Sequence, residues 1–453
     1  MTSSPLRLVL TTLCLAVLAA QIDTAVVNLA MRPIGLDLEA DMRALQWVLD
    51  SYNLAYAALL LTGGLLADLY GRRRTFIAGS AILSVATLMC AAAPSAEILI
   101  AARALSGLGA ALLVPASLAI IRVAWLEPAE RSRVLGIWAA CNGLAMALGP
   151  TLGGMLIEYA GWRSIFLVVA PIGATAGALA WSCIPESSDP GKRHFDGAAQ
   201  LSGAAALGML AFAAIECRDA PYRALAALLA GATALAMFIR IEARQGSSAM
   251  VPLAIFRSRP FRGAMAATAG MTFGMYGALF LLPLAWQDAG RFGPLGAGIA
   301  LMPTALTFVA SSPWSGSLAV RHGTRPLAAG GLMLAGAGLL LISAGTRSPS
   351  ILLQETGLAL TGLGMGLATG PLMGAAVSAA PAERSGTASA LINVARMMGA
   401  SLGVAFLGAL FAMSSYPADG LRAAMLAGGA IQIACAVFTW RAIPAQARSP
   451  QCA

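Results

Sequence analysis

Charged residues are scarce in this sequence. Only 11% of its 453 residues are Asp, Glu, Lys or Arg, about half the share found in soluble proteins, whereas 58% are hydrophobic. The chain has a single lysine, Lys192, and two histidines, His194 and His322, which fall in predicted loops far apart. A soluble globular domain is therefore excluded, and the composition indicates a membrane protein.

Several kinds of chemical site are also missing. The seven cysteines form no Cys-x-x-Cys pair, so we expect neither a disulfide framework nor a metal site. Lys192 lacks the upstream glycine of a phosphate-binding loop, which argues against ATP-driven work by this chain. Without a His-Glu-x-x-His motif or a paired nucleophile and base, we expect no enzyme and no cofactor. The net charge of +9 is spread over loops without a nucleic-acid motif, so no nucleic acid is expected as a partner.

Long apolar windows follow one another along almost the whole chain. Each is about 20 residues long, which is the length of a membrane-spanning helix, and the ten-residue alternation of an outer-membrane barrel is missing. The sequence therefore predicts an all-α polytopic membrane protein with fourteen transmembrane helices. The predicted spans are 7–30, 45–66, 75–93, 97–121, 134–157, 164–183, 197–216, 222–241, 261–286, 295–319, 326–345, 350–373, 388–412 and 420–441.

The basic residues indicate which side of the membrane each loop occupies. With the N-terminus inside, 19 of the 29 Lys and Arg residues fall in inside segments and eight in outside segments. The excess of positive charge on the cytoplasmic side of membrane proteins therefore predicts that both termini are cytoplasmic.

The chain also contains an internal echo. Gly316–Gly323 follows the tenth span as Gly64–Gly71 follows the second, with Val320 in place of Asp68. We therefore expect the last six spans to repeat the first six, with spans seven and eight inserted between them. The expected domains are an N-terminal half at 1–183, a linker with the inserted pair at 184–260, and a C-terminal half with a short tail at 261–453.

The segment after the second span has the features of a cytoplasmic hinge. Gly64 and Gly71 allow a tight turn, and the run Arg72, Arg73 and Arg74 cannot enter hydrocarbon cheaply. We expect Asp68 to end the preceding helix and to accept hydrogen bonds from the amides that open the next one, where a carboxylate is favoured.

Three charged residues fall within the first, second and fourth spans. Asp23 lies ~10 Å below the outer end of its span, and Asp50 and Arg103 lie ~8–9 Å deep at a rise of about 1.5 Å per residue. Arg103 can therefore pair with Asp23 or with Asp50, and a buried carboxylate of this kind is a functional candidate. Two structural alternatives stay open: the Asp23–Arg103 pair only stabilises the fold, or Asp50 sits at the headgroup level.

Three further spans carry candidate residues. In the fifth span, small residues and a proline, Gly149, Pro150, Gly153 and Gly154, predict close helix contact and a bend. In the thirteenth span, Arg396 is the one deep charge of the C-terminal half, where it anchors an anionic substrate group or bonds carbonyl groups. The methionine-rich stretch of the ninth span either lines an adaptable cavity or faces lipid, and its candidates are Met271, Met275 and Tyr276. Glu158, Glu216, Asp288 and Glu355 are expected to be solvated at outer helix ends.

Gly-x-Leu-Ala-Asp-x-x-Gly-Arg-Arg at 64–73 resembles the signature loop of the major facilitator superfamily, with Leu69 where arginine is usual. Gly-Pro-x-x-Gly-Gly at 149–154 resembles its antiporter motif, with Ala145 replacing an earlier glycine. The first span resembles the Asp-x-x-x-Val-Asn-x-Ala-x-Pro signature of fourteen-helix drug:proton antiporters, with Arg32 inserted. Further segments that look like this subfamily are 103–111, with Ser106 where glutamine is common, 161–166 and 383–396.

This resemblance implies a bacterial inner-membrane protein that exports small amphipathic compounds, including drugs, by proton-coupled alternating access. It implies proton coupling by Asp23 and Arg103 and a cytoplasmic gate at Asp68 and Arg72; Asp50 has no clear counterpart. The expected partners are a small-molecule substrate, protons and the lipid bilayer, without ATP, and a monomer is expected. An exporter of an endogenous metabolite and a transporter-like receptor or scaffold are the alternatives. Further substrate-cavity candidates are Asn28, Tyr52, Asn53 and Asn393.

Overall fold

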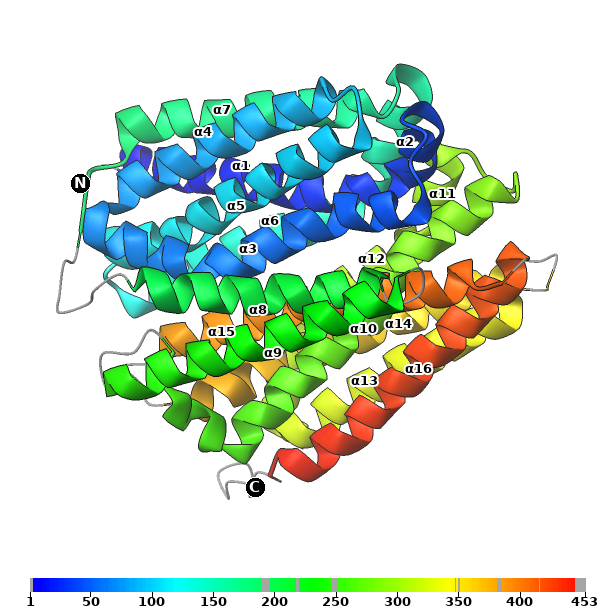
Figure 1. Cartoon of the computed structure of the whole chain (residues 1–453). Coiled ribbons are helices and arrows are strands. Elements are labelled where there is room, and N and C mark those ends of the chain that lie inside the picture. Colours follow the sequence, from blue (N-terminus) through cyan, green and yellow to red (C-terminus); the bar gives the residue numbers. More distant parts are fainter. Residues whose placement is uncertain are drawn as a thin grey trace. The chain divides into compact units, whose positions relative to one another are not determined.

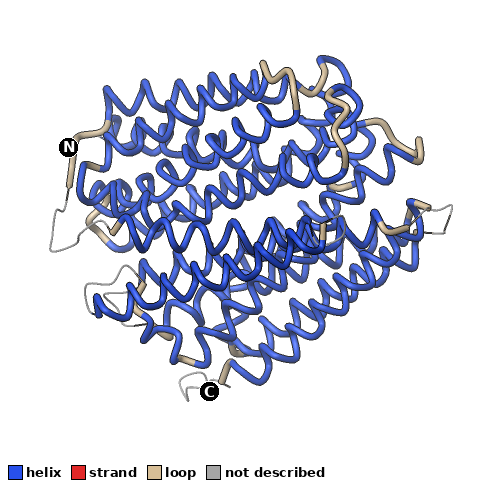
Figure 2. Tube along the Cα trace, viewed as in Figure 1, coloured by secondary structure: helices blue, strands red, loops and turns tan. Residues whose placement is uncertain are grey.

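The computed structural model describes residues 3–188, 196–216, 220–246, 251–346, 348, 351–380, 385–414 and 416–444. These residues form helices joined by short connections, and no strand occurs among them (Figure 2). Lys192, Arg193 and His194 of the predicted linker and the Glu383-Arg384 pair lie outside the described residues.

The chain divides into two compact units. The first comprises Met1–Met250 together with Gly290–Ile299, and the second comprises Val251–Ala289 together with Ala300–Ala453. The inserted helix pair therefore belongs to the first unit, as does most of the short helix α11 (Pro294–Ala300). The other elements of the first unit are α1 (Ser3–Val27), η1 (Asn28–Ala30), α2 (Met31–Asp37), α3 (Met42–Tyr70), α4 (Arg72–Ala91), α5 (Ala96–Ala124), α6 (Pro128–Ala160), α7 (Arg163–Cys183), α8 (Gly197–Glu216) and α9 (Pro221–Gln245) (Figure 1).

The second unit is built from long helices of similar length. They are α10 (Arg259–Asp288), α12 (Met302–His322), α13 (Thr324–Gly345), α14 (Leu352–Ser378), α15 (Ser385–Ala412) and α16 (Pro417–Ala442), preceded by the 3-10 helix η3 (Leu253–Arg257). Within the described residues, thirteen helices are long and apolar enough to cross a membrane. The 33-residue α6 coincides with the remaining predicted span, so each of the fourteen predicted windows falls on a helix. The predicted all-helical polytopic fold is confirmed.

The two units repeat one scheme of helix packing. In the first, α5 packs against α3 and α4, α7 packs against α4, and α1 packs against α6 and α7. In the second, α14 packs against α12 and α13, α16 packs against α13, and α10 packs against α15 and α16. The internal repeat predicted from the glycine-containing echo is therefore present in the packing.

The turns at the two repeated glycine-containing segments are also alike. Gly71 alone joins α3 to α4, with a φ of 113°, and Gly323 alone joins α12 to α13, with a φ of 93°. A residue with a Cβ atom rarely adopts such a φ, which explains why glycine stands at both positions.

Helix ends differ from the predicted ones in the first unit. The first span continues through η1 and α2 to Asp37, which puts Asp23 ~21 Å from that end rather than ~10 Å. The α3 helix continues to Tyr70, so Arg72–Arg74 form the first turn of α4 and not a loop. Sequence hydropathy marks the apolar interior of a helix, but it does not mark helical turns that extend past the bilayer.

Polar contacts attach the inserted pair to the first unit. Gln200 on α8 donates a hydrogen bond to the Ala58 carbonyl on α3 and accepts one from the Thr62 hydroxyl. At the other end of α8, Glu216 is buried and lies 3.5 Å from an Arg43 guanidinium nitrogen. The expectation that Glu216 is solvated was therefore wrong, because this packing brings a basic side chain of α3 to it.

Candidate functional site

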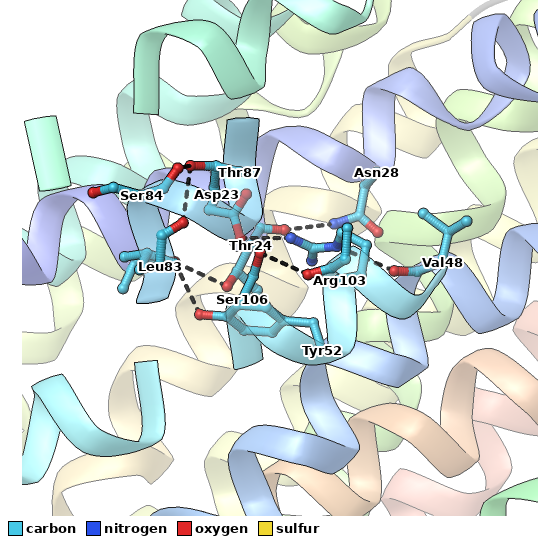
Figure 3. Close-up of polar contacts among 12 residues, drawn as sticks. Asp23, Thr24, Asn28, Val48, Tyr52, Leu83, Ser84, Thr87, Arg103 and Ser106 are labelled. Atoms are coloured by element: carbon cyan, nitrogen blue, oxygen red, sulfur yellow. Dashed lines mark hydrogen bonds and ion pairs between the residues drawn. The ribbon is translucent and has the colours of Figure 1, made fainter. Parts of the chain in front are cut away.

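A buried ion pair lies among α1, α3 and α5. Asp23 Oδ2 is 2.5 Å from Arg103 Nη1, and the two side chains are almost wholly inaccessible to solvent. Of the two partners predicted for Arg103, the structure shows Asp23. Figure 3 shows the two residues converging with Tyr52 from the three helices.

The rest of the Arg103 side chain is held by α3. Its Nε donates a 3.2 Å hydrogen bond to the Val48 carbonyl, and its guanidinium carbon lies 4.5 Å from the centre of the Tyr52 ring. The Tyr52 hydroxyl in turn donates to the Ala20 carbonyl on α1, at 3.3 Å. The guanidinium is therefore fixed by an anion, a carbonyl and an aromatic face.

Only one of the two Asp23 carboxylate oxygens pairs with Arg103. Its Oδ1 is buried and has no hydrogen-bond partner among the described residues. A buried carboxylate oxygen without a donor is costly when charged, and protonation removes that cost. The nearby Ser106, at a position where glutamine is common in the resembling family, bonds back to the Ala102 carbonyl of its own helix, at 3.1 Å.

The other polar candidates of the first unit are also buried. Asp50 lies on α3 two residues beyond Val48 and has 0% of its surface exposed, which argues against a solvated side chain at the headgroup level. Asn53 and Asn28 are buried as well, and the Asn28 amide donates to the Thr24 carbonyl at 3.4 Å. The layer around Asp23 is thus rich in buried polar groups.

The predicted hinge contains a charge cluster arranged differently from expectation. Arg72 donates from Nη2 and Nε to Asp68 Oδ1, at 3.0 and 3.3 Å. Asp68 lies inside α3, four residues before Arg72, and the expectation that it ends this helix was wrong. Gly64 faces Pro115 of α5, where a Cβ would meet only ordinary contact at 3.7 Å.

Glu186, which the sequence did not single out, takes the predicted capping role. Its Oε1 accepts from the Arg73 amide at 3.0 Å, and its Oε2 accepts from the Arg74 amide at 3.1 Å. Because the positive end of a helix dipole and three arginines coincide at the start of α4, a carboxylate there is strongly stabilising. The residues after α7 are in this way tied to the first turn of α4.

The antiporter-like segment of α6 makes close helix contacts. A Cβ on Gly149 would lie 2.9 Å from the Ala25 Cβ, and Gly153 abuts Val26 on α1. Gly154 faces the Pro294 carbonyl of α11, and Glu158 accepts a 3.0 Å hydrogen bond from the Leu295 amide. The small residues thus let α1 and α11 approach α6, which includes Pro150 within its length.

A second set of contacts lies at the opposite helix ends of the first unit. Asp37 Oδ2 is 2.5 Å from Arg163 Nη1 and accepts a 3.1 Å hydrogen bond from Trp162 Nε1. Arg163 also donates to the Ala93 carbonyl, at 3.1 Å. The Gly-Trp-Arg segment therefore joins the ends of α2 and α4 to the start of α7. The sequence offered no signal for Asp37 except an acid after the first span.

In the second unit, Met271 and Met275 are buried, so the lipid-facing alternative for them was wrong. The Met271 carbonyl accepts a 2.8 Å hydrogen bond from Gln432 on α16. Tyr276 and Arg396 are partly buried, and Asn393 bonds back to the Ser389 carbonyl at 3.1 Å. No group of His, Cys, Asp or Glu residues able to hold a metal ion occurs in the described part of the chain.

In the described part of the chain, fourteen long helices in two repeated units, with a buried ion pair in the first, define a multi-pass membrane protein. The chain belongs to the major facilitator superfamily, whose sequence profile matches residues 13–404. It is 35% identical over 395 residues to the multidrug resistance protein Stp of Mycobacterium tuberculosis, covering 86% of this chain and 73% of that protein. It is 34% identical over 450 residues to the methylenomycin A resistance protein of Bacillus subtilis, covering 97% and 95%.

Solved structures agree on the fold. A peptide transporter crystallised in complex with sulfate has a TM-score of 0.73 with this chain at 16% identity, covering 96% of this chain and 94% of that one. At this identity the similarity shows the fold alone. The family and the helices together make this chain a multi-pass transporter of the plasma membrane, and not an enzyme.

Proposed function

We propose that this protein is a proton-coupled exporter of small amphipathic molecules. The observation that carries the proposal is the buried Asp23–Arg103 pair, with Asp23 Oδ1 left without a hydrogen-bond donor among the described residues. Ionisable groups within membrane spans are expensive and commonly mark proton relays. The relatives named for drug resistance support small amphipathic compounds as cargo.

In this mechanism, Asp23 carries the proton. When Asp23 is charged, it holds Arg103 at 2.5 Å, with Val48 and Tyr52 fixing the same guanidinium. A proton on Asp23 removes the negative charge, so Arg103 loses most of its attraction to α1. Proton binding thereby loosens α1 from α5, and this change is coupled to alternating access between the two units. Asp50, fully buried on α3, is the second candidate for a proton.

The orientation follows from the basic residues. The excess of Lys and Arg in the inside segments supports cytoplasmic termini, and in that orientation Arg72–Arg74 and Glu186 form a cytoplasmic cluster at the start of α4. The Asp68–Arg72 pair belongs to this cluster and acts as part of the cytoplasmic gate. The transporter is proposed to work as a monomer with protons as its only coupling ion and without ATP.

Proton release on substrate addition tests the proposal. Purified protein in proteoliposomes receives ethidium, neutral N-phenyl-1-naphthylamine or 1-naphthylacetate, and released protons are followed with a pH indicator. The Asp23→Asn variant is compared with Asp37→Asn, which removes an exposed carboxylate from the end of the same span. Release in the wild type and in Asp37→Asn, but not in Asp23→Asn, is the expected result.

Other results have definite meanings. Release that persists in Asp23→Asn would move coupling away from Asp23, and Asp50→Asn would then be tested. No release and no proton-driven transport of any probe in the wild type would reject drug:proton antiport. Export of an endogenous metabolite would then be the better interpretation of the fold.

A further inference from the structure

Arg396 is an isolated charge deep in the second unit. It lies on α15, 11 residues after Ser385 and 16 before Ala412, which places it ~17 Å from one helix end and ~24 Å from the other. At that depth a guanidinium is far from both aqueous surfaces of a bilayer about 30 Å thick. It is therefore costly unless something compensates its charge.

No described carboxylate of the second unit reaches that depth. Asp288 is the last residue of α10, whereas Glu355 and Asp419 lie in the first turns of α14 and α16. The Nε of Arg396 is buried and has no hydrogen-bond partner among the described residues. Arg103 in the first unit differs in this respect, because Asp23 neutralises it. The second unit thus has a deep positive charge without a described counter-charge.

The surroundings of Arg396 are well fixed by α10. Gly399 and Gly403 on α15 contact the backbone of α10 directly, which sets the register of the two helices. The Thr272 hydroxyl donates a 2.8 Å hydrogen bond to the Arg396 carbonyl. Tyr276 lies one helical turn beyond Thr272 on the same helix. A cation on α15 and a hydroxyl-bearing side chain on α10 therefore lie on two helices in direct contact.

This arrangement is suited to binding an anion. Guanidinium groups bind carboxylate and sulfonate oxygens in a bidentate manner, and a phenol hydroxyl can donate a further hydrogen bond. The alternative, in which Arg396 is held by backbone carbonyls, leaves its buried Nε without an acceptor. Binding of an anionic group would supply both the missing charge and the missing acceptor.

We propose that Arg396, together with the Tyr276 hydroxyl, binds the anionic group of the transported molecule, so that the preferred cargo is an amphipathic organic acid. This inference rests on the proposed transport function and adds the charge class of the substrate. It assigns the recognition of anionic cargo to α10 and α15 of the second unit.

The proposal has an electrical consequence. Exchange of one entering proton for one departing monoanion moves two positive charges inward, whereas exchange for a neutral molecule moves one. An interior-negative potential therefore drives export of an acid more strongly than export of its amide. This difference tests whether the acid leaves as an anion, whereas the Arg396 variants test whether that residue binds it.

Matched acids and amides provide the test. The probes are 1-naphthylacetate and 1-naphthylacetamide, together with a panel of larger aromatic acids and their amides, and ethidium as a cation. Binding is measured by thermal stabilisation of the purified protein, and transport is measured in proteoliposomes at a potential set with potassium and valinomycin. The variants are Arg396→Gln, Arg396→Lys and Tyr276→Phe, with Arg422→Gln on an exposed position of α16 as the matched control.

The expected result is that at least one acid binds the wild type and Arg422→Gln at least tenfold more tightly than its amide does. Arg396→Gln should abolish that preference, Arg396→Lys should retain part of it, and Tyr276→Phe should weaken it about three- to tenfold. Arg396→Lys keeps the test valid if the Gln variant fails to fold.

Two results would overturn the inference. One is that no acid of the panel shows binding that depends on Arg396. The other is that acids and amides respond equally to the membrane potential. If ethidium or an amide is still exported in a proton-dependent manner, only the anion inference fails. If the wild type binds acids but a proton gradient drives transport of no probe, the proposed function fails instead.

Discussion

The strength of the Asp23–Arg103 pair can be measured by a double-mutant cycle. Asp23→Asn and Arg103→Gln each remove one charge and leave the other buried. Loss of one member of a buried pair costs about 3–5 kcal/mol, whereas the double variant leaves no charge uncompensated. With charge centres about 4 Å apart and an effective dielectric constant of about 20, the mutual attraction is about 4 kcal/mol. We therefore expect a coupling energy of about 2–4 kcal/mol after partial relaxation.

The Asp37–Arg163 pair provides the control. Its N–O distance of 2.5 Å equals that of the buried pair, but 46% of the Asp37 side chain and 39% of the Arg163 side chain are exposed. An exposed pair contributes about 0.2–1 kcal/mol because water screens its charges. The matched cycle, Asp37→Asn with Arg163→Gln, should therefore give a coupling energy in that lower range.

The assay is reversible unfolding of the purified protein in mixed micelles of dodecyl maltoside and dodecyl sulfate. Four proteins per cycle give the coupling energy as the departure from additivity. A value for Asp23–Arg103 no larger than that for Asp37–Arg163 would refute the argument that burial strengthens this pair. In that case the site is hydrated in the membrane, and protonation of Asp23 could not loosen α1 from α5 as proposed.

Three further changes are expected to act in other parts of the molecule. Glu186→Ala removes the acceptor of two α4 amides and should lower the free energy of unfolding by about 0.5–2 kcal/mol in the same assay. Hydrogen exchange at the Arg73 and Arg74 amides should become faster in Glu186→Ala but not in Asp68→Ala, which serves as the control. Gly71→Ala and Gly323→Ala should each impose about 1–2 kcal/mol of backbone strain. Gly71→Ala should destabilise the protein more, because a Cβ on Gly71 would also press against the Glu186 carboxylate, and equal melting temperatures of the two variants would contradict this. Gln200→Leu should cost about 1–2 kcal/mol and make α8 more accessible to protease, and an unchanged digestion pattern would mean that its hydrogen bonds to α3 do not hold the inserted pair.

Much of the fold can be predicted from the sequence, since a membrane span must be a long apolar helix. Buried charges were the most informative residues, because their cost leaves few acceptable environments: Asp23 and Arg103 had to be compensated, and they compensate each other. The echo of Gly71 in Gly323 was informative for the same kind of reason, since a φ near 100° leaves little choice of residue.

Contacts between distant, ordinary residues could not be predicted. Glu186 follows Arg73 by more than a hundred residues and looks like any loop carboxylate, yet it caps α4. Glu216 looked like a solvated helix end because nothing in the sequence places Arg43 beside it. Met271 and Met275 lie on a helix that is apolar on all sides, so the pattern of residues does not indicate which face is buried.

The single-residue turns at Gly71 and Gly323 also bear on biogenesis. A ribosome delivers the chain to the insertion machinery from the N-terminus, and one residue is too short to form a loop that waits at the membrane surface. We therefore expect α3 and α4 to insert in direct succession, and α12 and α13 to do the same. In the proposed orientation, Arg72–Arg74 then serve as a retention signal that keeps the start of α4 on the cytoplasmic side. The turn at Gly323 has two arginines beside it, Arg321 and Arg325, so we expect a weaker retention signal there.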